Sequence, residues 1–184
     1  MESRRALRRA AERREAVRIA RRGAGVPNVY GFPLAVGRSL VLVRDVDDFD
    51  VDGFSVLPLL DVTDVRSRDC ERFLERVLRD EGQLRAVRPP AISLRLDAWV
   101  EVFSPLGAAG EIVIVECENQ PDDGFCIGLV TGVAGDAVGI HQFDATATWD
   151  TRPTVVPYAD ITRVRFDERY THVFARYVAD PPAS

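Results

Sequence analysis

The 184-residue chain lacks lysine altogether and contains only three cysteines, two histidines and one methionine. Three cysteines are too few for the disulfide framework of a small secreted protein, and they indicate a reducing, cytoplasmic environment. No apolar run approaches the roughly 20 residues that cross a bilayer, and no apolar segment of the signal-peptide type follows the basic N-terminus. The composition, 46% hydrophobic and 29% charged, excludes a disordered or fibrous chain. We therefore expect a globular, cytoplasmic protein of one larger or two small domains.

Arginine is concentrated at the N-terminus, although the whole chain is acidic with a formal net charge of −5. Residues 1–22 hold nine Arg against three Glu, and the remainder holds 15 Arg against 26 acids. A basic arm on an acidic body predicts either contact with nucleic acid or docking on an acidic surface of its own or a neighbouring subunit. We favour docking because the arm has no aromatic side chain to stack on bases. The candidate contact residues of the arm are Arg4, Arg5, Arg8 and Arg9.

An internal repeat organises the chain. Residues 55–66 (SVLPLLDVTDVR) align without a gap with residues 154–165 (TVVPYADITRVR), whereas ordinary composition gives roughly one identity in such a window. The identical pairs are Val56/Val155, Pro58/Pro157, Asp61/Asp160, Thr63/Thr162, Val65/Val164 and Arg66/Arg165. The sequence therefore predicts a tandem duplication with domains at 1–88 and 89–184.

Each half is predicted to form a helix, five short strands and a second helix, because β-branched apolar runs alternate with Gly, Asp and Pro turn signals. Strands are expected at 16–21, 30–36, 39–46, 54–59 and 62–66, and again at 111–117, 125–133, 137–143, 154–158 and 161–166. Helices are expected at 3–14, 69–79, 96–103 and 170–177.

Three details of the helices follow from the same patterns. The helix at 96–103 should end before Pro105, and the helix at 69–79 should bury Phe73 among its apolar residues and be capped by Gly82. A helix unbroken through residue 22 is the alternative to the first strand. It would place Arg14 and Arg18 on an apolar stripe, so a break near Glu15 is favoured.

A helix followed by five short, bent antiparallel strands is the layout of the Sm-like fold, and the second half resembles that family in sequence. Residues 125–133 (FCIGLVTGV) are similar to the family's second strand with its characteristic glycine. Residues 154–164 (TVVPYADITRV) resemble its fourth and fifth strands with the tight turn between them. The resemblance implies a mainly β chain with flanking helices, made of two tandem Sm-like five-stranded bent-sheet barrels. Sm-like proteins form rings by pairing the fourth strand of one subunit with the fifth strand of the next, and many bind RNA.

The residues through which Sm-like proteins usually contact RNA do not occur at the matching positions. The turn between strands two and three, which carries Asp-x-x-x-Asn in the family, is VGRSL at 36–40 and VAGDAV at 133–138. Pro58-Leu59 and Pro157-Tyr158 stand in place of the family's Arg-Gly, and the Lys-His pair of the bacterial RNA-chaperone branch is missing as well. The acidic body also opposes a phosphate backbone, whose binding depends on Lys and Arg. Resemblance in fold therefore does not extend to this function.

Metal binding and catalysis are weakly indicated. Asp48, Asp50 and Asp52 match the first half of a calcium-binding loop, but Leu59 stands where a bidentate Glu should close it, so we interpret the segment as a solvated turn. Two histidines are too few for a His-based metal site. The chain has no nucleophile elbow, phosphate loop or dinucleotide fingerprint. We predict no catalytic residue, no cofactor and no metal.

Cys117 and Cys126 are placed to face each other across a hairpin, and we expect them to be free thiols because buried free cysteine is the commoner state.

These patterns together predict a non-catalytic module for binding or assembly, which contacts protein partners and forms homo-oligomers through strand edges. The Thr and Arg of both fifth strands would form a polar rim around such a contact. RNA binding through the Arg-rich arm is the alternative, with Tyr158 at the turn where a barrel-type RNA contact would lie. A third hypothesis, an enzyme of unknown chemistry, stays open because acids are abundant. The alternative to homo-oligomers is a monomer whose helices at 69–79 and 170–178 cover the edges. The candidate residues of the strand edges are Thr63, Arg66, Tyr158, Thr162 and Arg165.

Overall fold

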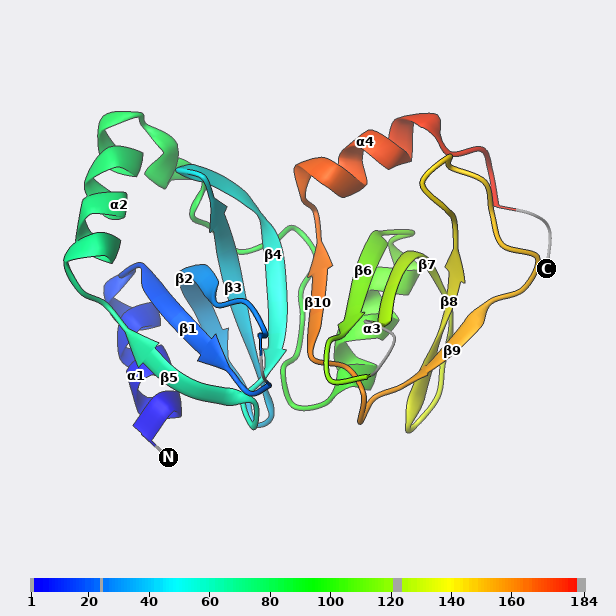
Figure 1. Ribbon diagram of the computed structural model, residues 1–184, viewed down its shortest axis with the longest axis horizontal. Helices are drawn as coiled ribbons and strands as arrows, with labels where there is room; N and C mark the ends of the chain where they lie inside the picture. Colours follow the sequence, from blue (N-terminus) through cyan, green and yellow to red (C-terminus); the bar gives the residue numbers. More distant parts are fainter. Residues whose placement is uncertain (1, 24, 121–123, 182–184) are drawn as a thin grey trace. The chain divides into compact units, whose positions relative to one another are not determined.

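The computed structural model describes residues 2–23, 25–120 and 124–181. The chain divides into two compact units, Met1–Ala91 and Ile92–Ser184, and each contributes antiparallel strands and helices (Figure 1). The chain is therefore mainly β with flanking helices, as expected. Of the helices in the described part of the chain, none is both long and apolar enough to cross a membrane.

The first unit forms a five-stranded sheet whose strands follow the order β5-β1-β2-β3-β4. Its elements are α1 (Glu2–Arg13), β1 (Val17–Arg21), β2 (Val29–Val36), β3 (Leu40–Asp47), β4 (Asp50–Pro58), β5 (Val62–Arg66), α2 (Asp69–Asp80) and the short 3-10 helix η1 (Gln83–Ala86). The first helix packs Leu7 and Ala10 into a core with Val17, Ile19 and Val41, while α2 contributes Leu78 to a separate cluster around Phe32.

The second unit repeats this arrangement with the order β10-β6-β7-β8-β9. Its elements are α3 (Trp99–Ala108), β6 (Ile112–Cys117), β7 (Gly124–Val133), β8 (Ala137–Gln142), β9 (Thr154–Pro157), β10 (Arg163–Phe166) and α4 (Arg169–Tyr177). Its core includes Ile112, Ile114, Ile127 and Phe143, against which Phe174 of α4 packs. In both units the fifth strand therefore returns beside the first.

The second strand of each unit carries a glycine that its neighbour requires. A Cβ at Gly31 would lie 2.2 Å from the carbonyl oxygen of Arg44, and one at Gly128 would lie 1.9 Å from that of His141. In both hairpins the register shifts two residues further on, after Pro33 in β2 and after Val130 in β7. Such bulges bend a strand and increase its twist. The close approach and the bend thus occur at the same place in both sheets.

The turn between the fourth and fifth strands is also shared. The N–H of Asp61 donates to the carbonyl oxygen of Pro58 over 3.1 Å, and the N–H of Asp160 donates to that of Pro157 over the same distance. The proline can end each strand because it needs no ladder donor there. The identical residues in the sequence repeat therefore occupy equivalent turns.

The structure decides between the alternatives at the end of the first helix. It ends at Arg13, Arg14 adopts a left-handed φ of 53°, and β1 follows, so a helix unbroken through residue 22 is wrong. At the end of α2, Gly82 adopts a φ of 71° and its N–H donates to the carbonyl of Arg79, which is the expected glycine cap.

Two predictions about helices are wrong. The third helix begins at Trp99 and continues through Pro105 to Ala108, because burial of Val102, Phe103 and Leu106 outweighs the hydrogen bond that proline removes. The helix α2 does not bury Phe73, which is 48% exposed. Three apolar residues of α4 are exposed in the same way, namely Tyr170, Val173 and Tyr177.

Candidate interaction surfaces

The arginines of the N-terminal arm lie on α1, which packs on its own unit through Leu7 and Ala10. Arg4 is half-buried, and its guanidinium donates to the carbonyl oxygen of Gly37 in the β2–β3 turn. The other three candidate arginines of the helix, Arg5, Arg8 and Arg9, are exposed. One side of α1 therefore serves the core, and another presents positive charge to solvent.

The fifth strand of the first unit lies at one end of its sheet and carries two of the candidate residues. Thr63 is exposed, and its hydroxyl donates to the carbonyl of Ala20 in β1 over 3.1 Å. Arg66 is exposed as well and forms an ion pair with Asp64 two residues earlier on the same strand. In the part of the chain that the structure describes, β5 has β1 as its one ladder partner within this unit.

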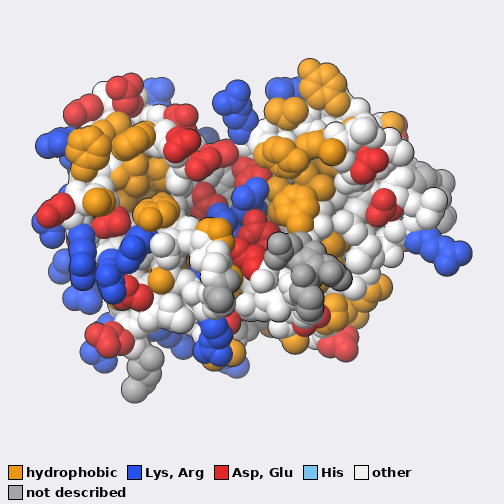
Figure 2. Space-filling model, viewed as in Figure 1, with side chains coloured by type: hydrophobic (Ala, Val, Ile, Leu, Met, Phe, Trp, Pro, Cys, Tyr) orange, Lys and Arg blue, Asp and Glu red, His pale blue; other side chains and the backbone are white. Residues whose placement is uncertain are grey.

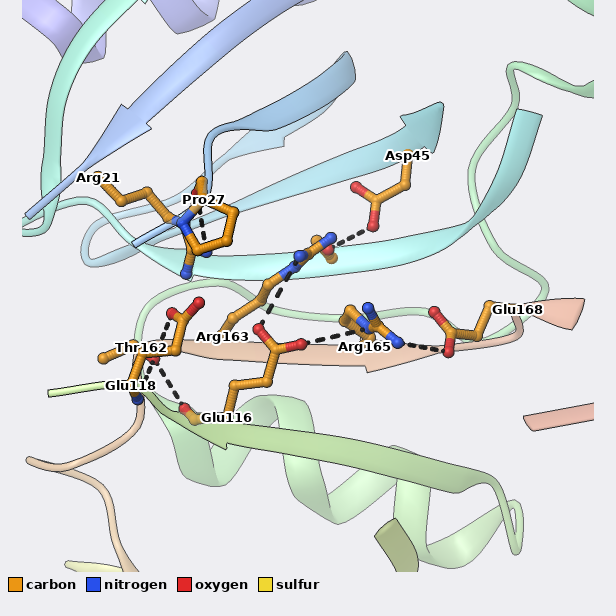
Figure 3. A network of polar contacts seen from close by, with 10 residues as sticks. Arg21, Pro27, Asp45, Glu116, Glu118, Thr162, Arg163, Arg165 and Glu168 are labelled. Atoms are coloured by element: carbon orange, nitrogen blue, oxygen red, sulfur yellow. Dashed lines mark hydrogen bonds and ion pairs between the residues drawn. The ribbon is translucent and has the colours of Figure 1, made fainter. Parts of the chain in front are cut away.

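The equivalent threonine of the second unit has a different environment. Thr162 is only 4% exposed, and its hydroxyl lies 2.9 Å from the carbonyl oxygen of Glu116 and 2.8 Å from the carboxylate of Glu118 (Figure 3). It also accepts a hydrogen bond from the N–H of Glu118 over 3.2 Å. Thr162 therefore fixes β6 to the start of β10 and does not belong to an exposed polar rim.

Arg165 contacts two acids of its own unit (Figure 3). Its Nη2 lies 2.8 Å from Oε1 of Glu168, and its Nε lies 3.5 Å from Oε1 of Glu116. Glu168 is the N-terminal cap of α4, so the guanidinium joins the end of β10 to the beginning of that helix. Arg165 thus has an internal role that the sequence did not indicate.

Tyr158 ties the turn after β9 to two other elements. Its hydroxyl donates to the carbonyl oxygen of Ala134 over 3.0 Å, and its ring stacks on Phe103 of α3 with centroids 5.9 Å apart. Burial, with a smaller contribution from Asp136, raises the pKa of the phenol. These contacts give Tyr158 a packing role within the second unit.

The fourth strand of the second unit, β9, lies at the end of its sheet. It is four residues long, it pairs with β8 along one side, and Val155 at its centre is 69% exposed. An exposed β-branched residue on a terminal strand favours contact with another strand or chain. Of the strands that end the two strand orders, β4, β5, β9 and β10, we take this strand and β5 as the candidate edges.

One group of titratable side chains was not marked by the sequence. Oε1 of Glu111 accepts the N–H of Asp167 over 3.2 Å, and the Asp167 carboxylate lies 2.8 Å from Nε2 of His172. Glu111 and His172 border a cavity of about 310 Å³ beside α4. Burial first, and then the charge of Asp167, raise the pKa of Glu111. Because His172 and Asp167 are 56% and 43% exposed, we interpret their contact as a surface ion pair.

Of the aspartates at 48–53, Asp48 lies in a turn, whereas Asp50 and Asp52 lie on β4, so the expected turn is limited to two residues. Asp48 and Phe49 both have positive φ and connect β3 to β4 as a two-residue hairpin turn, and Asp50 accepts a hydrogen bond from Gln83 over 2.7 Å. Among the described residues, no three His, Cys, Asp or Glu side chains are grouped as metal ligands.

The three cysteines are free. Cys126 lies opposite Val115 and Cys117 opposite Gly124, so the two thiols of this hairpin are offset along its strands. Burial raises the pKa of Cys117 to about 11, which keeps it protonated at neutral pH.

Comparison of the chain with known protein families, with curated proteins and with solved structures finds no match. The resemblance to Sm-like proteins therefore stays a prediction. The geometry of the two units is therefore the basis for inferring function.

Proposed function

We propose that the chain is a non-catalytic binding and assembly module made of two Sm-like barrels, which joins to further copies of itself through strand edges. Three shared features support this proposal: the strand order 5-1-2-3-4 in both units, the glycine of the second strand, and the hydrogen-bonded Pro-to-Asp turn. A bent sheet of this order is what the Sm-like layout requires.

The observation that carries the proposal is the nature of the two candidate edges. The candidate edge β5 is a fifth strand and ends the strand order of the first unit opposite β4, and the candidate edge β9 is a fourth strand and ends that of the second unit opposite β10. The family assembles by joining a fourth strand to a fifth. Each unit thus has a fourth strand and a fifth strand at opposite ends of its strand order, which suits head-to-tail addition through one edge of each kind and closure into a ring.

The proposed contact between strand edges is small. Closure of the chains into a ring would therefore have to add to the stability of the assembly. Strands of four and five residues provide only a few ladder hydrogen bonds, each with a net contribution of about 0.5–1.5 kcal/mol. The Asp64–Arg66 pair and Pro157 are features that natural sheets use to limit unspecific pairing at an edge. Specific pairing of β9 with β5, with Val155 buried in the contact, is the arrangement that satisfies both edges.

Light scattering of the full chain at micromolar concentration tests this function. We expect the mass of two or more chains of 20.4 kDa each. Val155→Glu should lower this mass because the substitution would bury a charge in the contact. Tyr177→Glu, at another exposed apolar side chain outside the edges, is the control and should leave the mass unchanged. A wild-type mass of a single chain would overturn the proposal.

A second candidate function, RNA binding, is favoured by the exposed Arg5, Arg8 and Arg9 of α1. Three phosphate contacts would give weak binding that falls steeply with salt. The ratio of absorbance at 260 and 280 nm shows whether nucleic acid copurifies with the chain. Titration with a generic RNA should then give a dissociation constant no tighter than the non-specific range of about 10⁻⁴–10⁻⁶ M. Nanomolar binding that is lost in Arg5→Glu/Arg9→Glu would establish RNA as the principal ligand.

A further inference from the structure

The first unit has an open groove lined by aromatic side chains from three elements. Tyr30 comes from β2, Phe49 from the β3–β4 turn and Phe73 from α2, and they are 42%, 48% and 48% exposed. The groove has a volume of about 680 Å³, within the range of about 300–1,000 Å³ typical of ligand sites. Figure 2 shows hydrophobic side chains gathered over α2 with carboxylates around them. We call this the aromatic groove.

Phe49 occupies a backbone conformation that its side chain disfavours. Asp48 and Phe49 have φ of 42° and 68°, the left-handed region in which two-residue hairpin turns normally carry Asn and Gly. A bulky residue with positive φ is uncommon, and such strain is concentrated at functional sites. Burial does not offset this strain, because the Phe49 ring is half exposed. Its ring contact is an edge-to-face one with Phe73, with centroids 6.1 Å apart. Packing alone does not account for a phenylalanine at this position.

Carboxylates line the rim of the aromatic groove, while on the α2 side the Arg76 guanidinium lies over the Phe73 ring, 5.2 Å from its centroid. Asp47, Asp48 and Asp69 are exposed at its rim, and Asp69 is partly offset by Arg72 at 3.4 Å. Glu71 also lines it but is buried and accepts the backbone N–H of Arg68 over 2.7 Å. The aromatic floor and the acidic rim together favour a ligand that is apolar at its centre and positive at its ends.

We propose that the aromatic groove binds a short segment of a partner protein in which an aromatic or large aliphatic side chain is flanked by Arg or Lys. A buried anchor of this kind supplies affinity, and the rim carboxylates supply steering and selectivity. The basic helix α1 of a second copy does not fit, because its apolar residues Leu7 and Ala10 are already buried in their own unit. This binding is independent of the proposed strand-edge assembly.

The second unit shows that the groove is not a necessary result of this fold. There the β8–β9 connection is longer, and it brings Trp149 against Phe143 at 5.3 Å, with its Nε1 donating to the carbonyl oxygen of Ala179 over 2.9 Å. The indole thereby occupies space beside α4 that stays open beside α2. A short turn with a strained, exposed phenylalanine is therefore specific to the first unit.

Selection of a random 12-residue peptide library on the full chain tests the proposal. We expect enrichment of peptides in which an aromatic or large aliphatic residue lies within a few positions of Arg or Lys. The most enriched peptide, labelled with fluorescein, should bind in an anisotropy titration and lose affinity when the salt concentration rises. Selection that enriches no such class would overturn the proposal.

Variants then locate the binding. Phe49→Gly and Phe73→Ser should each weaken binding of the labelled peptide at least tenfold, while Leu60→Ser, at a 77% exposed leucine outside the groove, should not. Because glycine adopts a positive φ without steric cost, Phe49→Gly should not lower the melting temperature. A loss of peptide binding in this variant would therefore not result from unfolding. Equal affinity of the wild type and Phe49→Gly would refute the site.

The charge of the rim is tested separately. Asp47→Asn/Asp69→Asn should weaken binding several-fold and reduce its dependence on salt, whereas Asp80→Asn at the far end of α2 should do neither. An unchanged salt dependence in the double variant would eliminate a basic partner. The mass of the chain in light scattering should be the same for all of these variants, so failure of this proposal is distinguishable from failure of the strand-edge assembly.

Discussion

The two units share a strand order but differ in the connection between their third and fourth strands. In the first unit Asp48 and Phe49 alone connect β3 to β4, and in the second unit residues 143–153 connect β8 to β9. The short turn leaves the aromatic groove of about 680 Å³ beside α2, and the long connection, with Trp149, leaves about 310 Å³ beside α4. The two units therefore share their strand order, and the connection between the third and fourth strands determines how much open space lies beside the following helix.

This difference indicates where two units with the same strand order can differ in function. The shared features, among them Gly31 and Gly128, lie where two strands approach each other closely, and changes there would disturb the sheet. A loop on the surface tolerates insertion at small cost. We therefore expect the turn at residues 48–49, and not the strands, to determine which ligand the first unit selects.

The largest expected loss of unfolding free energy follows substitution of the two glycines, Gly31 and Gly128, at which neighbouring strands approach closely in both units. Gly31→Ala and Gly128→Ala each place a Cβ within 2.2 Å of a backbone oxygen, so we expect each to cost about 2–3 kcal/mol of unfolding free energy. Gly132→Ala, on the same strand as Gly128 but with no atom within 4 Å of its Cβ, is the control and should cost less than about 0.5 kcal/mol. Urea unfolding measures all three. If only one of the two glycines were sensitive, the two units would not be structural equivalents.

The next effect concerns the loop that distinguishes the second unit. Trp149→Ala removes the ring contact with Phe143 and the hydrogen bond to Ala179. The indole is half-buried, so we expect a loss of about 2 kcal/mol, below the 3–5 kcal/mol of a fully buried aromatic. Hydrogen exchange should show the loss in the second unit, with α2 and the first sheet unchanged. Tyr177→Ala, at a 74% exposed ring of α4, should stay within about 0.5 kcal/mol of the wild type.

How far the sequence predicts this structure differs between the frame and the sites. The strands are predictable because β-branched runs such as Ile112–Cys117 alternate with turn residues, and the repeat doubles the signal. The extent of α3 is not, because its continuation through Pro105 depends on tertiary burial of Leu106. The aromatic groove escapes prediction for a similar reason. Phe73 falls on the apolar stripe of its helix, and only the loop geometry shows that nothing in its own unit covers it fully.

A smaller loss of unfolding free energy is expected from substitution of the paired threonines of the sequence repeat. Thr162→Val removes hydrogen bonds to Glu116 and Glu118 from a buried site, and we expect a cost of about 1–2 kcal/mol. Thr63→Val, at the exposed equivalent in β5, should cost at most about 0.5 kcal/mol, because water can hydrate the carbonyl that its hydroxyl contacts. Chemical denaturation of both variants gives the comparison. Equal costs would mean that β5 is as enclosed as the start of β10.

The smallest effect is a dependence of stability on pH that arises from Glu111 in the second unit. The pKa of Glu111 is raised in the folded state by burial and by the neighbouring Asp167, so the folded chain binds this proton more tightly than the unfolded chain. The contribution of Glu111 to stability should consequently fall as the pH rises from the unfolded pKa of the carboxyl through its higher folded value, and this contribution should be constant above that. Glu111→Gln keeps an oxygen for the N–H of Asp167 and removes the charge, so it should abolish this fall and raise stability slightly at neutral pH. The melting temperature of the second unit between pH 4 and pH 7, compared for wild type and variant, measures the effect; a wild-type curve that rises where the variant is flat would show that Glu111 is stabilised as the carboxylate.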